Sequence, residues 1–301
     1  MYIFLNPLAD EIHEVLKMTV FYKFEESRPS GPVEADLPGE VLGRPVLFAT
    51  LVGSHTYNLN TPASDRDYHL FVCPTFDDLY RGDMLTKQFI TEAQDLAVYD
   101  VRRIPELLWK SNPSFIDVMF SKQILIKDPI TGNRELDGSI TKEILSMFEL
   151  REPLARMNLP YFWDASIGIF MHKTRNFVKG TSGTVDLVQR YGYDTKQVMH
   201  ALRGLWVLQR YADNGFTSFR DATWFEGADR DYMLSVRNGA YGIQDAIRAM
   251  DEKLTEVQRY EPIYKGYAPN VDTREALDGH VRRIIEEMTL DALESGRGRL
   301  R

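Results

Sequence analysis

Four residues between positions 53 and 67 have the types and spacing needed for metal-dependent chemistry at phosphorus. Gly53 and Ser54 follow one apolar run, and Asp65 and Asp67 precede a second one. Glycine has no Cβ, so its backbone can approach a triphosphate closely, and Ser54 offers a hydroxyl and an amide to phosphate oxygens. Asp65 and Asp67 would leave the same face of a strand and could share Mg²⁺ or Mn²⁺. Two such ions polarise the attacking and leaving oxygens of an in-line displacement.

Chemistry of this kind usually needs a third carboxylate, which binds one ion and can take the proton of the attacking hydroxyl. We place it at Asp95, which opens a segment typical of a neighbouring strand. Asp100 has a competing role as a helix N-cap, and Asp117 lies in an apolar segment. The predicted catalytic and metal-binding set is therefore Asp65, Asp67 and Asp95, with Asp100 and Asp117 as the alternatives.

A second group of polar residues is predicted on one helix. Lys196, His200 and Arg203 are spaced i, i+4 and i+7, so they share one stripe, and Asp194 is a plausible N-cap. Such a stripe could face phosphates or bases, or it could be an ordinary solvated face. For the basic residues of the preceding helix, a solvated face is the more usual reading: Lys173, Arg175 and Lys179.

The elements that must position these residues change in character along the chain. Strands are expected at 46–52, 66–73, 94–99 and around 124–126, and helices at 139–149, 161–179, 195–212, 229–237, 242–260 and 273–295. Residues 10–22 have apolar positions at helix-like spacing that then become strand-like, and we expect an exposed loop over 23–44 and a loop with a short helix over 74–88. The order predicts an α+β fold, with a mixed sheet flanked by helices in residues 1–138 and a mostly helical domain in 139–301.

Composition limits the classes of partner. The chain has 301 residues and a formal net charge of −8, which argues against non-specific coating of nucleic acid. No apolar run is long enough to span a membrane, and the N-terminus lacks the pattern of a signal peptide. Cys73 is the only cysteine, so an internal disulfide and a cysteine zinc site are excluded. A cytoplasmic setting is expected, and the oligomeric state is left open.

The segment from Gly53 to Asp67 resembles the polymerase-beta-type nucleotidyltransferase superfamily, and more narrowly the RNA repair pathway DNA polymerase beta family. Supporting likeness extends over residues 46–250 and is carried by residues 107–113 with Asp117, 192–196 with Met199, His200 and Arg203, and 236–239. The chain departs from the family pattern at Asn58, where glycine is common. It departs again at His69 and its neighbours, where a basic residue and a glycine are usual.

The resemblance implies a metal-dependent enzyme that moves an NMP from an NTP to a hydroxyl and releases pyrophosphate. It implies that Gly53 and Ser54 bind the nucleotide and that the three carboxylates hold two metal ions. Lys196, His200 and Arg203 match the family's helical motif and are assigned to the nucleotide. An RNA end is the expected acceptor. Two alternatives stay open: a non-catalytic nucleotide- or RNA-binding module, and an enzyme that nucleotidylates a protein or tRNA, as some toxins do.

Overall fold

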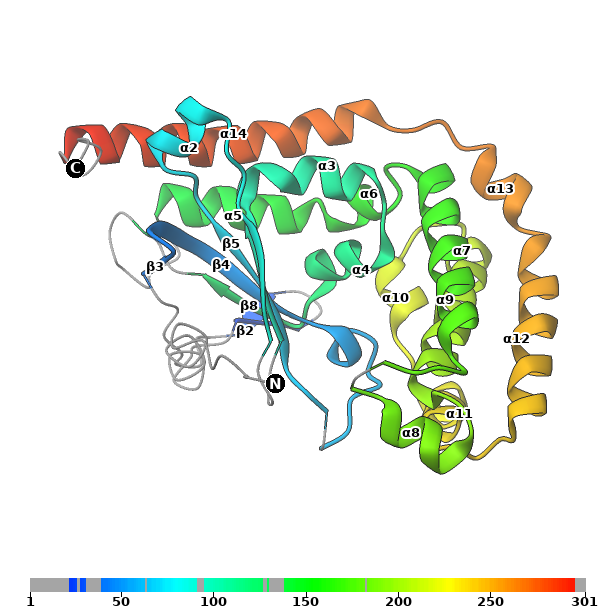
Figure 1. Ribbon diagram of the computed structural model, residues 1–301. Coiled ribbons are helices and arrows are strands. Elements are labelled where there is room, and N and C mark those ends of the chain that lie inside the picture. Colours follow the sequence, from blue (N-terminus) through cyan, green and yellow to red (C-terminus); the bar gives the residue numbers. More distant parts are fainter. Residues whose placement is uncertain are drawn as a thin grey trace.

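The computed structural model describes residues 22–25, 28–30, 39–62, 64–90, 95–126, 129, 138–181 and 183–295. A mixed sheet with helices along one side stands beside a group of helices (Figure 1). The α+β fold predicted from the sequence is confirmed, and so is the mostly helical character of the C-terminal region. The segment 10–22, with helix-like and then strand-like spacing, lies outside the described residues apart from Tyr22, which begins a strand.

Within the described residues the sheet has eight strands in the order β2-β1-β8-β4-β5-β7-β6, with β3 paired to β4. The β5–β7 pair is parallel and the other described pairs are antiparallel. The strands are β1 (Tyr22–Glu25), β2 (Arg28–Ser30), β3 (Glu40–Val41), β4 (Arg44–Val52), β5 (Asp67–Val72), β6 (Thr86–Ile90), β7 (Asp95–Asp100) and β8 (Gln123–Ile126).

Strand β4 is the centre of the sheet because its run of apolar and β-branched residues is buried on both faces. On one face Ala49 and Leu51 pack with Leu70 of β5 in a small cluster. On the other face Phe48 stacks on Phe71 with ring centroids 4.5 Å apart and belongs to the main core. Side chains that alternate along β4 and β5 therefore serve two different cores.

Helices from distant parts of the chain cover the main-core face of the sheet. They are α3 (Ile104–Trp109), α5 (Ser139–Glu149) and α14 (Val271–Glu294). Phe148 of α5 meets the Phe48 ring edge-on at 5.6 Å. Helix α14 buries one stripe of apolar residues: Leu277, Val281, Ile284 and Met288. Three short helices complete this part: α2 (Phe76–Arg81), α4 (Pro113–Ile116) and α6 (Arg151–Ala155).

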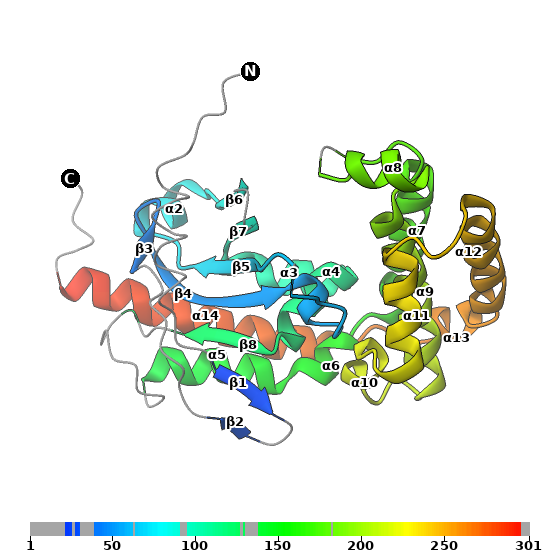
Figure 2. The ribbon, with the colours of Figure 1, turned by 90° about the horizontal axis from the view of Figure 1, so that it is seen from below.

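The second group of helices is built around α9 (Thr195–Asp213), which begins at the predicted N-cap, Asp194. Val198, Leu202 and Leu205 of this helix are buried, as the amphipathic pattern indicates. The surrounding helices are α7 (Leu159–Asn176), α8 (Val185–Tyr191), α10 (Phe219–Thr223), α11 (Gly227–Arg237), α12 (Ile243–Gln258) and α13 (Glu261–Lys265). Figure 2 shows this group standing apart from the sheet and its covering helices.

Two expectations about local structure were wrong. The segment 23–44, predicted as a loop, contains parts of β1, β2 and β3, and β6 begins within the loop expected over 74–88. Both segments hold Pro, Gly and charged residues, and they form strands because the sheet offers them hydrogen-bonding edges, which a local pattern does not reveal. The boundary at 138/139 stays a prediction; α5 and α14 both pack on the sheet. No helix in the described ranges is long and apolar enough to cross a membrane.

Candidate active site

One cleft of about 520 Å³ brings together most of the residues that the sequence singled out. Gly53 and Ser54 follow the end of β4; Asp67 is the first residue of β5, and Asp65 lies two residues before the strand rather than on it. Lys196, His200 and Arg203 of α9 line the same cleft from the helical group. The cleft therefore lies where the edge of the sheet faces α9, two parts of the chain that Figure 2 shows opposite each other.

Gly53 and Asp67 are in close contact across the strand ends. Val52 pairs with Asp67 in the β4–β5 ladder, and Gly53 follows with a φ of +78°. A Cβ on Gly53 would lie 3.1 Å from Oδ2 of Asp67. Glycine is therefore required here for two reasons, the left-handed backbone and the space taken by a carboxylate. The sequence analysis inferred glycine at this position from the close approach of a phosphate, and the space taken by the Asp67 carboxylate is an additional requirement.

The loop between Gly53 and Asp65 is held at its tip by the helical group. Asn58 has a φ of +58°, a left-handed conformation that asparagine tolerates better than most residues, so it can stand where glycine is common. Its side-chain amide donates to the Phe225 carbonyl at 2.9 Å, and the Phe225 amide donates to the Tyr57 carbonyl at 3.2 Å. Arg230 of α11 donates to the carbonyls of Asn58 and Asn60, at 2.7 and 3.2 Å. Helices far along the sequence thus fix the position of the loop.

His55 ties the two ends of this loop together. Its Nε2 lies 3.2 Å from the Asp65 carbonyl oxygen, which fits a structural role. Burial lowers the pKa of His55, and the backbone hydrogen bond opposes that shift. Asp65 is thereby held near the Gly53–Ser54 turn through its backbone, while its side chain is exposed in the cleft.

The three candidates for a third carboxylate have different surroundings. Asp95 is the first residue of β7, and because Tyr68 pairs with Leu96 in parallel register, the backbone of Asp95 lies beside that of Asp67. Asp100 is fully buried at the other end of β7, where it accepts from the Arg102 amide at 2.9 Å and pairs with the Arg102 guanidinium at 2.6 Å. Asp100 is therefore a cap and an ion-pair partner, as its competing explanation predicted.

Asp117 lies in the wall of the cleft and is almost fully buried. The Tyr57 hydroxyl donates to its Oδ1 at 2.8 Å, and the Arg203 guanidinium lies 3.7 Å from the centre of the Tyr57 ring. Burial raises the pKa of Asp117 to about 7, against the opposing effects of Arg203 and of the tyrosine hydrogen bond. Tyr57 is consequently a buried partner of Asp117.

Four cations from three helices form what we call the cationic wall: Lys173 of α7, Lys196 and Arg203 of α9, and Arg237 of α11. Burial lowers the pKa of His200 well below its usual value, and all four cations add to that shift. The pKa of Lys173 is also lowered, by burial and then by Arg203 and Lys196. Mutual repulsion of this kind favours binding of an anion. Lys173 was expected on a solvated face, and the structure places it in the cleft instead.

The residues of the cleft that the sequence analysis did not assign to the site include His69, Gln88 and Ser114. His69 could have been found, because it follows Asp67 by two positions on the same strand face. Burial lowers its pKa to about 4, so the imidazole is neutral at physiological pH. No sequence pattern around Gln88 or Ser114 points to a site. Gln88 reaches the cleft through the pairing of β6 with β7, and Ser114 through the position of α4.

The oxygen ligands of the cleft fit a hard divalent cation. Asp65 and Asp67 offer carboxylates from one strand end, and Mg²⁺ is commonly held by one or two carboxylates together with substrate phosphates. Among the described residues there is no group of three or more His, Cys, Asp or Glu side chains that could hold a metal by itself.

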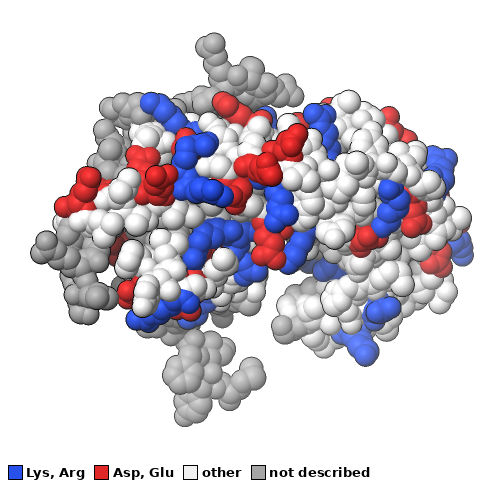
Figure 3. Space-filling model, turned by 90° about the horizontal axis from the view of Figure 1, so that it is seen from above, with Lys and Arg blue, Asp and Glu red and all other residues white. Residues whose placement is uncertain are grey.

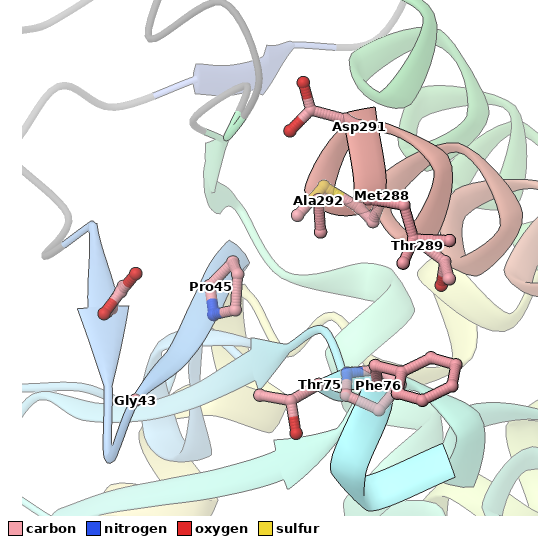
Figure 4. Close-up of a pocket in the computed structure, with 11 residues that line it drawn as sticks. Gly43, Pro45, Thr75, Phe76, Met288, Thr289, Asp291 and Ala292 are labelled. Atoms are coloured by element: carbon pink, nitrogen blue, oxygen red, sulfur yellow. The ribbon is translucent and has the colours of Figure 1, made fainter. Parts of the chain in front are cut away.

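A second cavity, of about 150 Å³, lies between α2, the β3–β4 turn and the C-terminal part of α14. Figure 4 shows Pro45 and Phe76 across from Met288 and Ala292. No residue predicted to act in catalysis or binding lines this cavity, so it is separate from the cleft.

Comparison with known proteins gives one result for part of the chain. Residues 19–140 match the model of the RNA repair pathway DNA polymerase beta family, whose description names a polymerase-beta-like activity in RNA repair. The match includes Gly53, Ser54, Asp65, Asp67 and Asp117, and it ends before the helices that carry the cationic wall. No curated protein matches the chain. The match confirms the resemblance inferred from the sequence for residues 19–140, which are less than half of the chain.

Proposed function

We propose that the protein is a metal-dependent nucleotidyltransferase that moves an NMP from an NTP to a hydroxyl of an RNA end and releases pyrophosphate. The observation that carries the proposal is the single cleft in which the Gly53–Ser54 turn and the Asp65 and Asp67 carboxylates face the cationic wall. A cleft with carboxylates on one side and cations on the other matches a substrate that brings both metal ions and phosphates.

The residues of the cleft would divide the work as follows. The amides and hydroxyl of the Gly53–Ser54 turn and the cationic wall bind the triphosphate, whose charge relieves the repulsion among the wall residues. Asp65 and Asp67 would hold Mg²⁺ or Mn²⁺, and a bound ion supplies Lewis-acid stabilisation of the phosphoryl oxygens. Asp95 would join them as the third carboxylate and take the proton of the attacking hydroxyl, and the backbone register of β7 beside β5 supports this role.

Asp117 has a positioning role in this proposal. It accepts a hydrogen bond from Tyr57, and Tyr57 carries the Arg203 guanidinium on its ring. The chain of contacts connects the loop before Asp65 to the cationic wall. It would keep the two sides of the cleft at a fixed separation, which group transfer requires because small displacements of reacting groups are costly.

An RNA end suits the charge distribution better than the side of a long strand. The net charge is −8, and on the face shown in Figure 3 basic and acidic side chains are interspersed. Non-specific binding along a nucleic acid relies on a continuous basic surface. The cationic wall gathers four basic residues inside the cleft, so recognition would be local to the terminal nucleotides.

The test uses each α-radiolabelled NTP in turn with Mg²⁺, the purified protein and total RNA. We compare wild type with Asp65→Asn and Asp67→Asn, which keep the shape of the carboxylates and remove their charge. Asp251→Asn on α12 is the matched control, because this aspartate is exposed and lies outside the cleft.

Label in RNA with wild type and Asp251→Asn, and its loss in both cleft variants, is the expected result. Label on protein would move the acceptor to a polypeptide, which is the toxin-like alternative. Metal-dependent NTP binding without label in any acceptor would favour the non-catalytic binding module. Equal labelling by Asp67→Asn and wild type would contradict the assignment of the cleft.

A further inference from the structure

We propose that His69, Ala97 and Gln88 form a site, which we call the acceptor notch, that recognises the ribose of the terminal nucleotide of the acceptor. The inference rests on the proposed function and adds a substrate-selecting element to it. Three arguments support the inference: the sheet register, a nitrogen without a hydrogen-bond partner among the described residues, and the direction from which an acceptor must approach.

The register places the three residues in one row across three strands. His69 of β5 pairs with Ala97 of β7, and Ala97 pairs with Gln88 of β6. Residues directly opposite one another in a sheet share a face, so His69 and Gln88 stand on either side of the small Ala97 side chain, with their strands roughly 10 Å apart. Both line the cleft. Ser114 of α4 also lines the cleft and supplies a hydroxyl.

Along β5 and β7, this row lies two residues after the row that contains Asp67 and Asp95. Asp67 precedes His69 by two residues on the same strand face, a separation of about 7 Å along the strand. Asp95 precedes Ala97 by two residues in the same way. A nucleotide whose hydroxyl reaches the carboxylate row can therefore place the rest of its sugar over the notch.

His69 has an unused hydrogen-bonding atom. Its Nδ1 is buried and has no hydrogen-bond partner among the described residues. The ring itself is fixed, because it packs against Tyr99 and Phe115 with ring centroids 5.2 and 6.3 Å away. Buried polar atoms are normally paired, so an unpaired nitrogen in a fixed ring at a cleft indicates a partner that the protein alone does not supply.

The reaction geometry decides which substrate that partner belongs to. In an in-line displacement the attacking and leaving oxygens lie on opposite sides of phosphorus. The leaving pyrophosphate would lie at the Gly53–Ser54 turn, after β4, and the acceptor must then approach from the other side of β5. The strand order β4-β5-β7-β6 puts the notch on that side.

The chemistry of the notch fits a sugar rather than a phosphate. The cations that line the cleft come from α7, α9 and α11, whereas the notch offers an imidazole and an amide, and the Ser114 hydroxyl lies in the same cleft. These groups donate and accept hydrogen bonds without charge, as a ribose hydroxyl does. The 2′-hydroxyl is the group that separates RNA from DNA at a given position, so the notch would favour an RNA end.

The test measures binding first and transfer second. Short fluorescein-labelled oligonucleotides that differ only in the last sugar, ribose or 2′-deoxyribose, are titrated with the protein in the presence of Mg²⁺ and followed by anisotropy. His69→Phe keeps the ring that packs on Tyr99 and Phe115, and Gln88→Met removes the amide from an exposed position on β6. His172→Phe on α7 is the matched control, because His172 is exposed and does not line the cleft.

Wild type and His172→Phe should bind the ribose end roughly threefold to tenfold more tightly than the deoxyribose end, the range expected for one hydrogen bond. His69→Phe and Gln88→Met should each reduce that preference and leave the affinity for NTP unchanged. No preference in wild type, or an unchanged preference in both folded variants, would overturn the notch. Transfer of label by wild type reports the proposed function separately, so a failure of one proposal is distinguishable from a failure of the other.

Discussion

Replacement of Gly53 by alanine tests whether the contact with Asp67 is essential. The backbone at Gly53 has a φ of +78°, which costs an alanine about 1–2 kcal/mol. The new Cβ would also lie 3.1 Å from Asp67 Oδ2, so the carboxylate must move by a few tenths of an ångström. A displacement of a reacting group by about 1 Å can cost roughly a hundredfold in rate, so we expect turnover to fall by at least about tenfold.

Gly82 provides a matched control for the backbone cost alone. It ends α2 with a φ of +74°, and a Cβ there would meet nothing within 4 Å. Gly82→Ala should lose about as much stability as Gly53→Ala and keep its activity. Thermal unfolding measures the first quantity, and transfer of radiolabelled NMP per folded molecule measures the second. Equal turnover in the two variants would refute the view that the glycine exists to admit the Asp67 carboxylate.

Three further outcomes follow from other contacts. Arg230→Met removes two hydrogen bonds to the carbonyls of Asn58 and Asn60, so the free energy of unfolding should fall by about 2 kcal/mol and transfer should fall with it. Unfolding curves and the labelling assay measure the two effects, and Arg248→Met, at an exposed position, is the control. The pKa of Asp117 is raised to about 7, so the folded state holds this proton more tightly than the unfolded state, and stability is lost as pH rises between about 4 and 7. Asp117→Asn should remove that loss, up to about 1.4 kcal/mol per pH unit, and an unchanged slope in melts across this range would contradict the burial argument. Cys73 is buried and its pKa is raised to about 12, so a thiol reagent should label it only after denaturation, and rapid labelling of the folded protein would count against this environment.

The parts of the site that the sequence predicted well are those encoded locally. Gly53, Ser54, Asp65 and Asp67 are recognisable because strand, turn and carboxylates follow each other within one hairpin. The stripe of α9 is recognisable for the same reason, since helical spacing determines which residues share a face. The long helices and the central strands were also predicted within a few residues, because their apolar periodicity extends over many positions.

The remaining features depend on contacts between distant segments. Lys173 reaches the cleft only because α7 packs beside α9, and the same residue on a differently packed helix would be a surface charge. Gln88 lies in the cleft because β6 pairs with β7 at one particular register. Strand β6 itself was missed, since a short segment with Lys and Gln becomes a strand by pairing with an existing edge. Asp117 was recognised as a candidate, but its partner Tyr57 is 60 residues away in the sequence.

The path of the chain has a consequence for the mechanics of the molecule. The polypeptide leaves the sheet region after α5, forms the whole helical group, and returns as α14 to lie against α5 (Figure 1). The helical group is thus an insertion between α5 and α14, and two covalent connections attach it to the sheet region. The insertion is also joined to the sheet region by the hydrogen bonds from Arg230 to the carbonyls of Asn58 and Asn60, so a separation of the two parts would require these bonds to break. A fragment that ends at residue 138 would lack both α5 and α14, and it would expose the apolar face on which Phe48 and Phe71 stack.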